Sequence, residues 1–106
     1  GYRADGAAVI VDRGAAEALA QGKSLLPAGV RAVVGEFDRG DTIRILDDAG
    51  AELAVGTTNY GSQDAARLVG RQADEIEAIL GYSFADEMIH RDFMIDSRYE
   101  EGENGN

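Results

Sequence analysis

The sequence contains no cysteine and no tryptophan, and it has a single histidine and a single proline. Without cysteine the chain can form no disulfide, and one histidine by itself cannot complete a zinc site. The lack of cysteine fits a reducing compartment, so we expect a cytoplasmic protein. No apolar run approaches the roughly 18 residues that a membrane-spanning helix requires, and we therefore expect no membrane partner.

Positive charge is also scarce. Twenty acidic residues face ten basic residues, which gives a formal net charge of −10. Only four of the acidic residues lie in the segment 96–106, so the acidity belongs to the folded body of the protein. Nucleic-acid affinity depends largely on lysine and arginine at phosphates, and this balance argues against tight RNA binding.

A chain of 106 residues with 44 % apolar and 28 % charged residues has the composition of one small globular domain. Short β-branched runs between turn residues are typical of strands, and alanine- and leucine-rich segments with one apolar face are typical of helices. These patterns predict strands at 7–11, 30–37, 42–46, 52–60 and 88–95, and helices at 14–21, 62–69 and 73–80.

The strands at 30–37, 42–46 and 52–60 follow one another through short turns. This spacing predicts a β-meander, and hence a β-rich α+β domain with a barrel or sandwich core. Ser62 is the expected N-cap of the helix that follows, and Gly81 is expected to end the last helix in a left-handed conformation.

Side-chain positions can be predicted in three places. Leu25 and Leu26, in the loop before the second strand, are expected to point inward, and most of the seven aromatic residues are expected to lie in the core. The strand period of two places Ile89, Phe93 and Ile95 on one face of the last strand.

Two motifs look catalytic but lack the context that catalysis needs. Gly22-Lys23-Ser24 is similar to the end of a phosphate-binding P-loop, yet the glycine that should precede it is missing and the lysine follows a helix. His90-Arg91-Asp92 is similar to a kinase catalytic loop, yet Ser97 stands where that loop has asparagine. No group of residues here could run a reaction, so we expect a binding, regulatory or assembly module.

A series of segments carries a more specific signal: VDRGA at 11–15, KSLLPAGV at 23–30, GEFDRGD at 35–41, NY at 59–60, residues 75–82 and HRD at 90–92. In order and spacing these segments resemble the C-terminal PUA domain of bacterial glutamate 5-kinases over residues 6–95. One departure is Ala73, where the family commonly has a serine that caps the helix. Asp74 is expected to take part of that capping role.

The resemblance implies a PUA fold, a mixed β pseudo-barrel flanked by short helices. The polar, acidic composition of the terminal segment 96–106 separately predicts a disordered tail. It also implies that an upstream amino-acid-kinase domain belongs to the same protein. That domain would phosphorylate L-glutamate with ATP and Mg²⁺ in proline biosynthesis, so the present chain would need no cofactor and would hold no catalytic residue.

Two functions follow from the resemblance. The domain could pack on its kinase domain and tune activity, feedback inhibition or a homo-oligomeric state, which predicts an exposed apolar patch. Alternatively, PUA domains elsewhere often bind structured RNA through the first helix, the loop after it and the neighbouring strands. Carried over to this sequence, that surface comprises Lys23, Ser24, Arg31 and Arg91. The net charge favours the first function.

Overall fold

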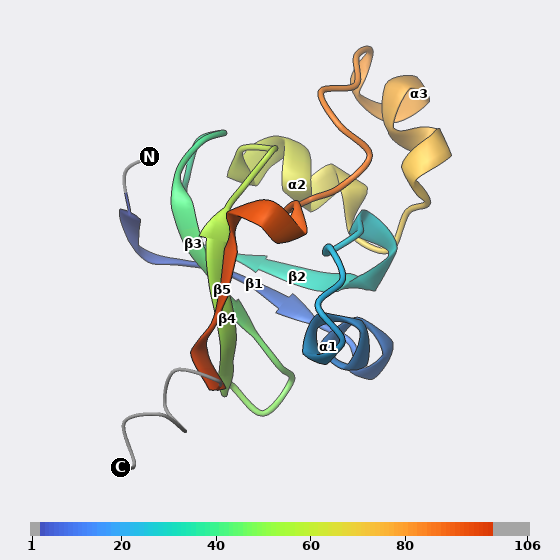
Figure 1. Ribbon diagram of the computed structural model, residues 1–106. Helices are drawn as coiled ribbons and strands as arrows, with labels where there is room; N and C mark the ends of the chain where they lie inside the picture. The colour runs from blue at the N-terminus through green and yellow to red at the C-terminus, as the bar shows by residue number, and fades with distance from the viewer. Residues whose placement is uncertain (1–2, 99–106) are drawn as a thin grey trace, which may run out of the picture.

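A computed structural model describes residues 3–98, and it describes side chains from residue 6 onward. One mixed sheet of five strands, in the order β2-β1-β3-β4-β5, forms the body of the molecule (Figure 1). The strands are β1 (Arg3–Val11), β2 (Val30–Val34), β3 (Thr42–Leu46), β4 (Glu52–Thr57) and β5 (Met94–Asp96). The α-helices are α1 (Arg13–Ala20), α2 (Ser62–Leu68) and α3 (Ile76–Leu80), and the 3₁₀ turns are η1 (Pro27–Gly29), η2 (Ala73–Glu75) and η3 (Arg91–Phe93).

The predicted three-strand meander is wrong, because β1 lies between β2 and β3. It pairs antiparallel with β2 and parallel with β3. Ala8 and Val9 point to opposite faces of β1, and both are fully buried, as expected for a central strand. Only β3 and β4 form a hairpin, whose turn is closed by Asp47 Oδ1 accepting from Ala49 N and Ala51 N. Local turn signals cannot reveal such a strand insertion, since it is decided by contacts distant in sequence.

The core is formed by buried side chains of the sheet and of the three helices. Ile43 and Ile45 of β3 are fully buried, and they alternate with the half-buried Arg44. In Figure 1, α1 lies beside the end of β1, while α2 and α3 lie together beyond β2. Helix α2 contributes the buried Leu68 and α3 the buried Ile76. No helix in the described range 3–98 is long and apolar enough to cross a bilayer.

The three helices occur where they were expected, but their caps differ. Gly61 occupies the N-cap of α2, so the prediction for Ser62 is wrong. The Ser62 hydroxyl instead accepts from Phe37 N at 3.1 Å. Before α3 the cap is Gln72, whose N–H donates to the Glu75 carboxylate at 2.8 Å, and not Asp74. Gly81 ends α3 with φ of 85°, as predicted.

The predicted strand at 88–95 is wrong over most of its length. Ile89 forms an isolated bridge with Leu25, residues 91–93 form the turn η3, and only residues 94–96 are a strand. The turn shifts the side-chain phase, because Phe93 N donates to His90 O. As a result Ile89 is fully buried, whereas 64 % of Phe93 is exposed.

Two further burial predictions are corrected. Leu25 is buried as expected, but Leu26 is exposed. Among the aromatic side chains that the structure describes, most are at the surface and not in the core. Phe37 and Tyr60 are buried, and Tyr82, Phe84 and Phe93 are exposed. The predicted acidic tail, 96–106, overlaps the described residues only at 96–98, and Asp96 is the last residue of β5. Residues 99–106 lie outside the described residues.

Candidate functional site

Three of the four predicted contact residues meet where two distant loops are joined. Leu25 N donates to Ile89 O at 2.9 Å, and Met88 N donates to Leu25 O at 2.8 Å. Beside this bridge the Ser24 hydroxyl accepts from Arg91 N at 2.9 Å. Ser24 is therefore a positioning residue, which places the segment of Arg91 next to the segment that begins at Lys23.

A groove of about 210 Å³ opens between the end of α1 and the η3–β5 segment, and we call it the Lys23–Arg91 groove. Arg31 does not line it, because this residue lies exposed on β2, at the opposite edge of the sheet from β5. The groove is lined by Leu19, Ala20, Gly22, Lys23, Arg91, Met94 and Asp96.

The groove carries unbalanced positive charge. Among the side chains that the structure describes, no carboxylate forms an ion pair with Lys23 or Arg91. The one acidic lining residue, Asp96, is engaged by the Arg98 guanidinium at 3.3 Å. The groove is thus a basic site on an acidic protein.

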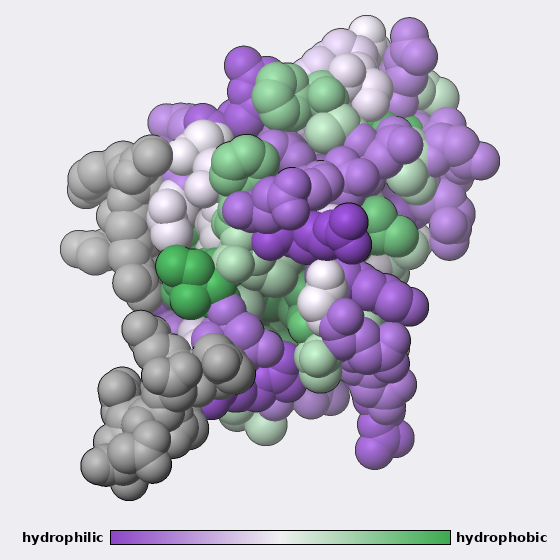
Figure 2. All heavy atoms as spheres, in the orientation of Figure 1, coloured by the Kyte–Doolittle hydropathy of each residue, from purple (hydrophilic) through white to green (hydrophobic). Residues whose placement is uncertain are grey.

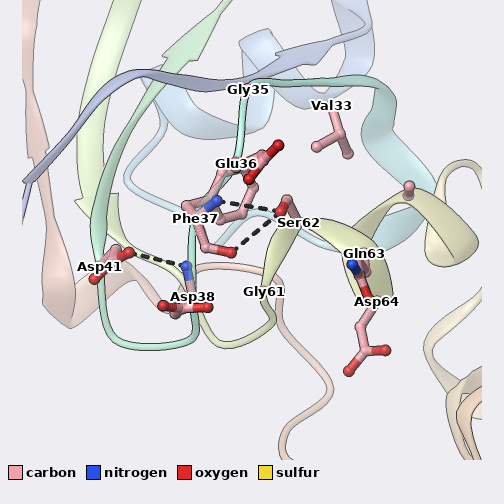
Figure 3. A pocket seen from close by; sticks show the side chains of 11 residues that line it. Val33, Gly35, Glu36, Phe37, Asp38, Asp41, Gly61, Ser62, Gln63 and Asp64 are labelled. Carbon is pink, nitrogen blue, oxygen red and sulfur yellow. Dashed lines mark hydrogen bonds between the residues drawn. The ribbon is translucent and has the colours of Figure 1, made fainter.

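A second, wider concavity of about 1130 Å³ lies between the β2–β3 connection and the start of α2 (Figure 3). Its shape is held by Ser62, which accepts from Phe37 N, and by Asp41 Oδ2, which accepts from Asp38 N at 2.9 Å. All of its charged lining residues are acidic: Glu36, Asp38, Asp41 and Asp64.

The lining of this acidic concavity includes no histidine, lysine or arginine beside its carboxylates. Across the residues that the structure describes, no group of three histidine, cysteine, aspartate or glutamate side chains is arranged to hold a metal ion. The Asp41 carboxylate shapes the turn, because it accepts from the backbone N–H of Asp38.

Beside the acidic concavity, the loop after α3 is fastened by two tyrosines. The buried Tyr60 hydroxyl accepts from Phe84 N and Ala85 N, both at 3.0 Å. Tyr82 donates to Asp64 Oδ2 at 2.5 Å. This hydrogen bond, together with partial burial and the negative charge of Asp64, raises the pKa of Tyr82 above its usual value.

Comparison with known proteins identifies the fold and the family. The model of the PUA domain family matches residues 7–80. The chain belongs to the PUA domain family. A solved PUA domain from Aeropyrum pernix, determined as a tartrate complex, has a TM-score of 0.58 and 27 % identity over 79 % of this chain and 41 % of its own. An archaeal box H/ACA ribonucleoprotein complex shares the fold with a TM-score of 0.55, at 19 % identity over 84 % of this chain and 26 % of its own.

Several glutamate 5-kinases are similar to this chain in sequence. The Rhizobium etli enzyme is 55 % identical over 80 % of this chain and 22 % of its own length. The Thermus thermophilus enzyme is 49 % identical over 81 % of this chain and 24 % of its own. The PUA domain thus spans about a quarter of the length of these relatives, and the predicted resemblance to the PUA domain of glutamate 5-kinases is confirmed.

In this PUA domain the sequence could indicate Lys23 and Ser24, which share one loop, but not their meeting with Arg91. The sequence did not reveal the acidic concavity either, because the carboxylates that line the concavity come from two separate segments, the 36–41 turn and α2. No local signal could have joined those segments, although the predicted turn and helix each contained their part of the site.

Proposed function

We propose that this PUA domain is the non-catalytic module of a glutamate 5-kinase and that it acts by packing on the amino-acid-kinase domain. Its role there is regulatory or structural: it tunes activity, feedback inhibition or oligomeric state. The kinase domain would bind ATP, Mg²⁺ and L-glutamate, and the PUA domain would contribute no reacting group. The similarity to enzymes about four times longer supports this assignment.

The observation that carries the proposal is the exposed apolar side chains around β5. Phe93 and Ile95 are 64 % and 62 % exposed, and both lie within a three-residue stretch. Figure 2 shows apolar side chains at the surface of this face among hydrophilic ones. Large apolar groups gathered at a surface are typical of a contact with another protein surface. Domain contacts within one chain bury about 600–1,500 Å², which a patch of this kind could anchor.

The test uses the full-length Rhizobium etli relative, in which this chain replaces the matching residues. Deleting the PUA domain should change the rate of ADP release with L-glutamate, its sensitivity to end-product inhibition, or the oligomeric state. Changing Phe93→Ser together with Ile95→Ser should reproduce the effect of the deletion. Burying one such side chain is worth about 1.5–3 kcal/mol, so the loss should be large.

Val34→Ser is the matched control. Val34 is also an exposed apolar residue, but it lies on β2, at the opposite edge of the sheet from β5. It should leave kinetics and assembly as they are in the parent. A full-length enzyme whose rate, inhibition and assembly are all indifferent to removal of the PUA domain would contradict the proposal.

A second candidate function is RNA binding, which PUA domains elsewhere often perform. The meeting of Lys23 and Arg91 in one basic groove, with Ser24 bound to the backbone of Arg91, favours it. The net charge of −10 disfavours it. It predicts salt-sensitive binding of structured RNA that is weakened by Lys23→Glu and by Arg31→Glu. Fluorescence anisotropy at two salt concentrations would measure this, and binding indifferent to both changes would contradict it.

A further inference from the structure

The Lys23–Arg91 groove has the charge and lining of a site for a small ligand. Its cations come from two segments distant in sequence. Its one acidic lining residue, Asp96 of β5, already accepts from Arg98 N at 2.8 Å and faces the Arg98 guanidinium. Because that negative charge is balanced locally, the charges of Lys23 and Arg91 remain available to an incoming group.

The end of α1 would ordinarily repel an anion, because the last carbonyls of a helix carry partial negative charge. Here these carbonyls are occupied. Ala18 O accepts from Gln21 N and from Lys23 N, both at 3.0 Å, and Leu19 O accepts from Gly22 N at 3.0 Å. The backbone therefore turns back at the helix end, so these two carbonyls are satisfied within the chain.

The two backbone segments that carry Lys23 and Arg91 are joined to each other before any ligand arrives. Leu25 and Ile89 are joined by backbone hydrogen bonds of 2.9 and 3.2 Å, and Ser24 binds the backbone of Arg91. A site whose framework is already ordered loses less entropy on binding, which favours affinity even for a small ligand.

We propose that the Lys23–Arg91 groove binds a small organic anion through a carboxylate or phosphate group. The guanidinium of Arg91 offers paired N–H donors to such an oxyanion, and Lys23 adds a point charge. The apolar part of the ligand would lie against Leu19 and Met94, which line the same groove. This inference is independent of the proposed contact with a kinase domain.

The size and charge of the protein favour a small anion over a polyanion. A volume of about 210 Å³ is below the roughly 300–1,000 Å³ typical of pockets for drug-sized ligands. A nucleic acid would extend beyond the groove and meet a protein of net charge −10, whereas a compact anion would experience mainly the two nearby cations.

The test is an amide-shift titration of the 106-residue chain with inorganic phosphate and, separately, with succinate, at about 0.02 M salt to limit screening. Saturable shifts are expected at Lys23, Ser24, Arg91 and Met94, with a Kd in the millimolar range. Lys23→Gln and Arg91→Gln should each weaken binding about tenfold or more, because each removes a charged hydrogen-bond donor.

Arg31→Gln is the control, because it removes the same charge from an exposed site outside the groove. It should change Kd less than twofold, as expected for a remote, screened charge. The Lys23 side chain makes no hydrogen bond to another described residue, so Lys23→Gln should fold normally and keeps the test decisive if Arg91→Gln does not fold.

Three outcomes would overturn the proposal. The first is the absence of saturable shifts with either anion up to about 50 mM, a concentration well above a millimolar Kd. The second is equal weakening by Arg31→Gln, which would show general attraction to positive charge. The third is binding of structured RNA at these residues when neither small anion binds, which would make the groove part of a nucleic-acid surface.

Discussion

The hydroxyl of Tyr60 provides a sharp test of how the loop after α3 is held. Tyr60 is fully buried, and its hydroxyl accepts from Phe84 N and Ala85 N at 3.0 Å and donates to Ala85 O at 2.5 Å. Tyr60→Phe removes one oxygen atom and leaves the ring in place, so it isolates these three hydrogen bonds from the packing of the core.

The expected cost can be worked from the number of bonds and their surroundings. Three hydrogen bonds, each worth about 0.5–1.5 kcal/mol, together give a range of about 1.5–4.5 kcal/mol. Phe84 is exposed and Ala85 half-buried, so water can reach part of the released backbone. We therefore expect the free energy of unfolding to fall by about 2 kcal/mol, a large share of the 5–15 kcal/mol typical of a domain.

Urea unfolding would measure the loss, and amide hydrogen exchange would locate it. Phe84 and Ala85 should lose protection in Tyr60→Phe, while the amides of β3 should open only with global unfolding. Tyr82→Phe is the matched control, because it loses a single hydrogen bond at an exposed position and should cost less than about 1 kcal/mol. A Tyr60→Phe protein within about 0.5 kcal/mol of the parent, with unchanged exchange at 84 and 85, would refute the reasoning.

Three further perturbations have defined outcomes. A Cβ on Gly29 would lie 2.5 Å from the Cβ of Ala15, so Gly29→Ala should lower the free energy of unfolding by about 1–3 kcal/mol, measured by urea unfolding. Gly14→Ala is the control, because Gly14 lies on the open side of α1, and this change should be neutral or slightly stabilising in the same experiment. Asp12→Ala removes the N-cap acceptor that binds Ala15 N at 2.8 Å and should cost about 1 kcal/mol, with Asp12→Asn as a control that retains most of the cap. Because the pKa of Tyr82 is raised in the folded state, the stabilisation by its protonated hydroxyl is complete below the usual tyrosine pKa of 10.0 and is lost as the pH rises through the folded-state pKa. Between pH 9 and 11 the free energy of unfolding should therefore fall more steeply with pH for the parent than for Tyr82→Phe. Identical slopes would contradict the assigned hydrogen bond.

The sequence alone was enough for features that depend on neighbouring residues. Strand β3 was predicted with its observed bounds, since Ile43 and Ile45 alternate with polar neighbours and Asp47 begins the turn that follows. Helix α3 ends at Gly81 as predicted, because a left-handed residue is needed there and glycine adopts that conformation without a Cβ clash.

Pairing between distant segments was decided only by the tertiary structure. The turn residues between 34 and 42 predicted adjacent strands, yet β1 enters between β2 and β3 because burying both its faces, including Ala8 and Val9, favours the centre of the sheet. Local turns fix where the chain reverses but not which strand it meets afterwards.

The candidate site follows the same division. Lys23 and Ser24 could be singled out because they share one loop, but their union with Arg91 depends on the bridge between Leu25 and Ile89. The turn η3 then reverses the expected phase of the last segment, which buries Ile89 and leaves a phenylalanine and an isoleucine at the surface. Residue types and local geometry could thus be read from the sequence, whereas the groove arises from long-range backbone hydrogen bonds, whose partners no local pattern specifies.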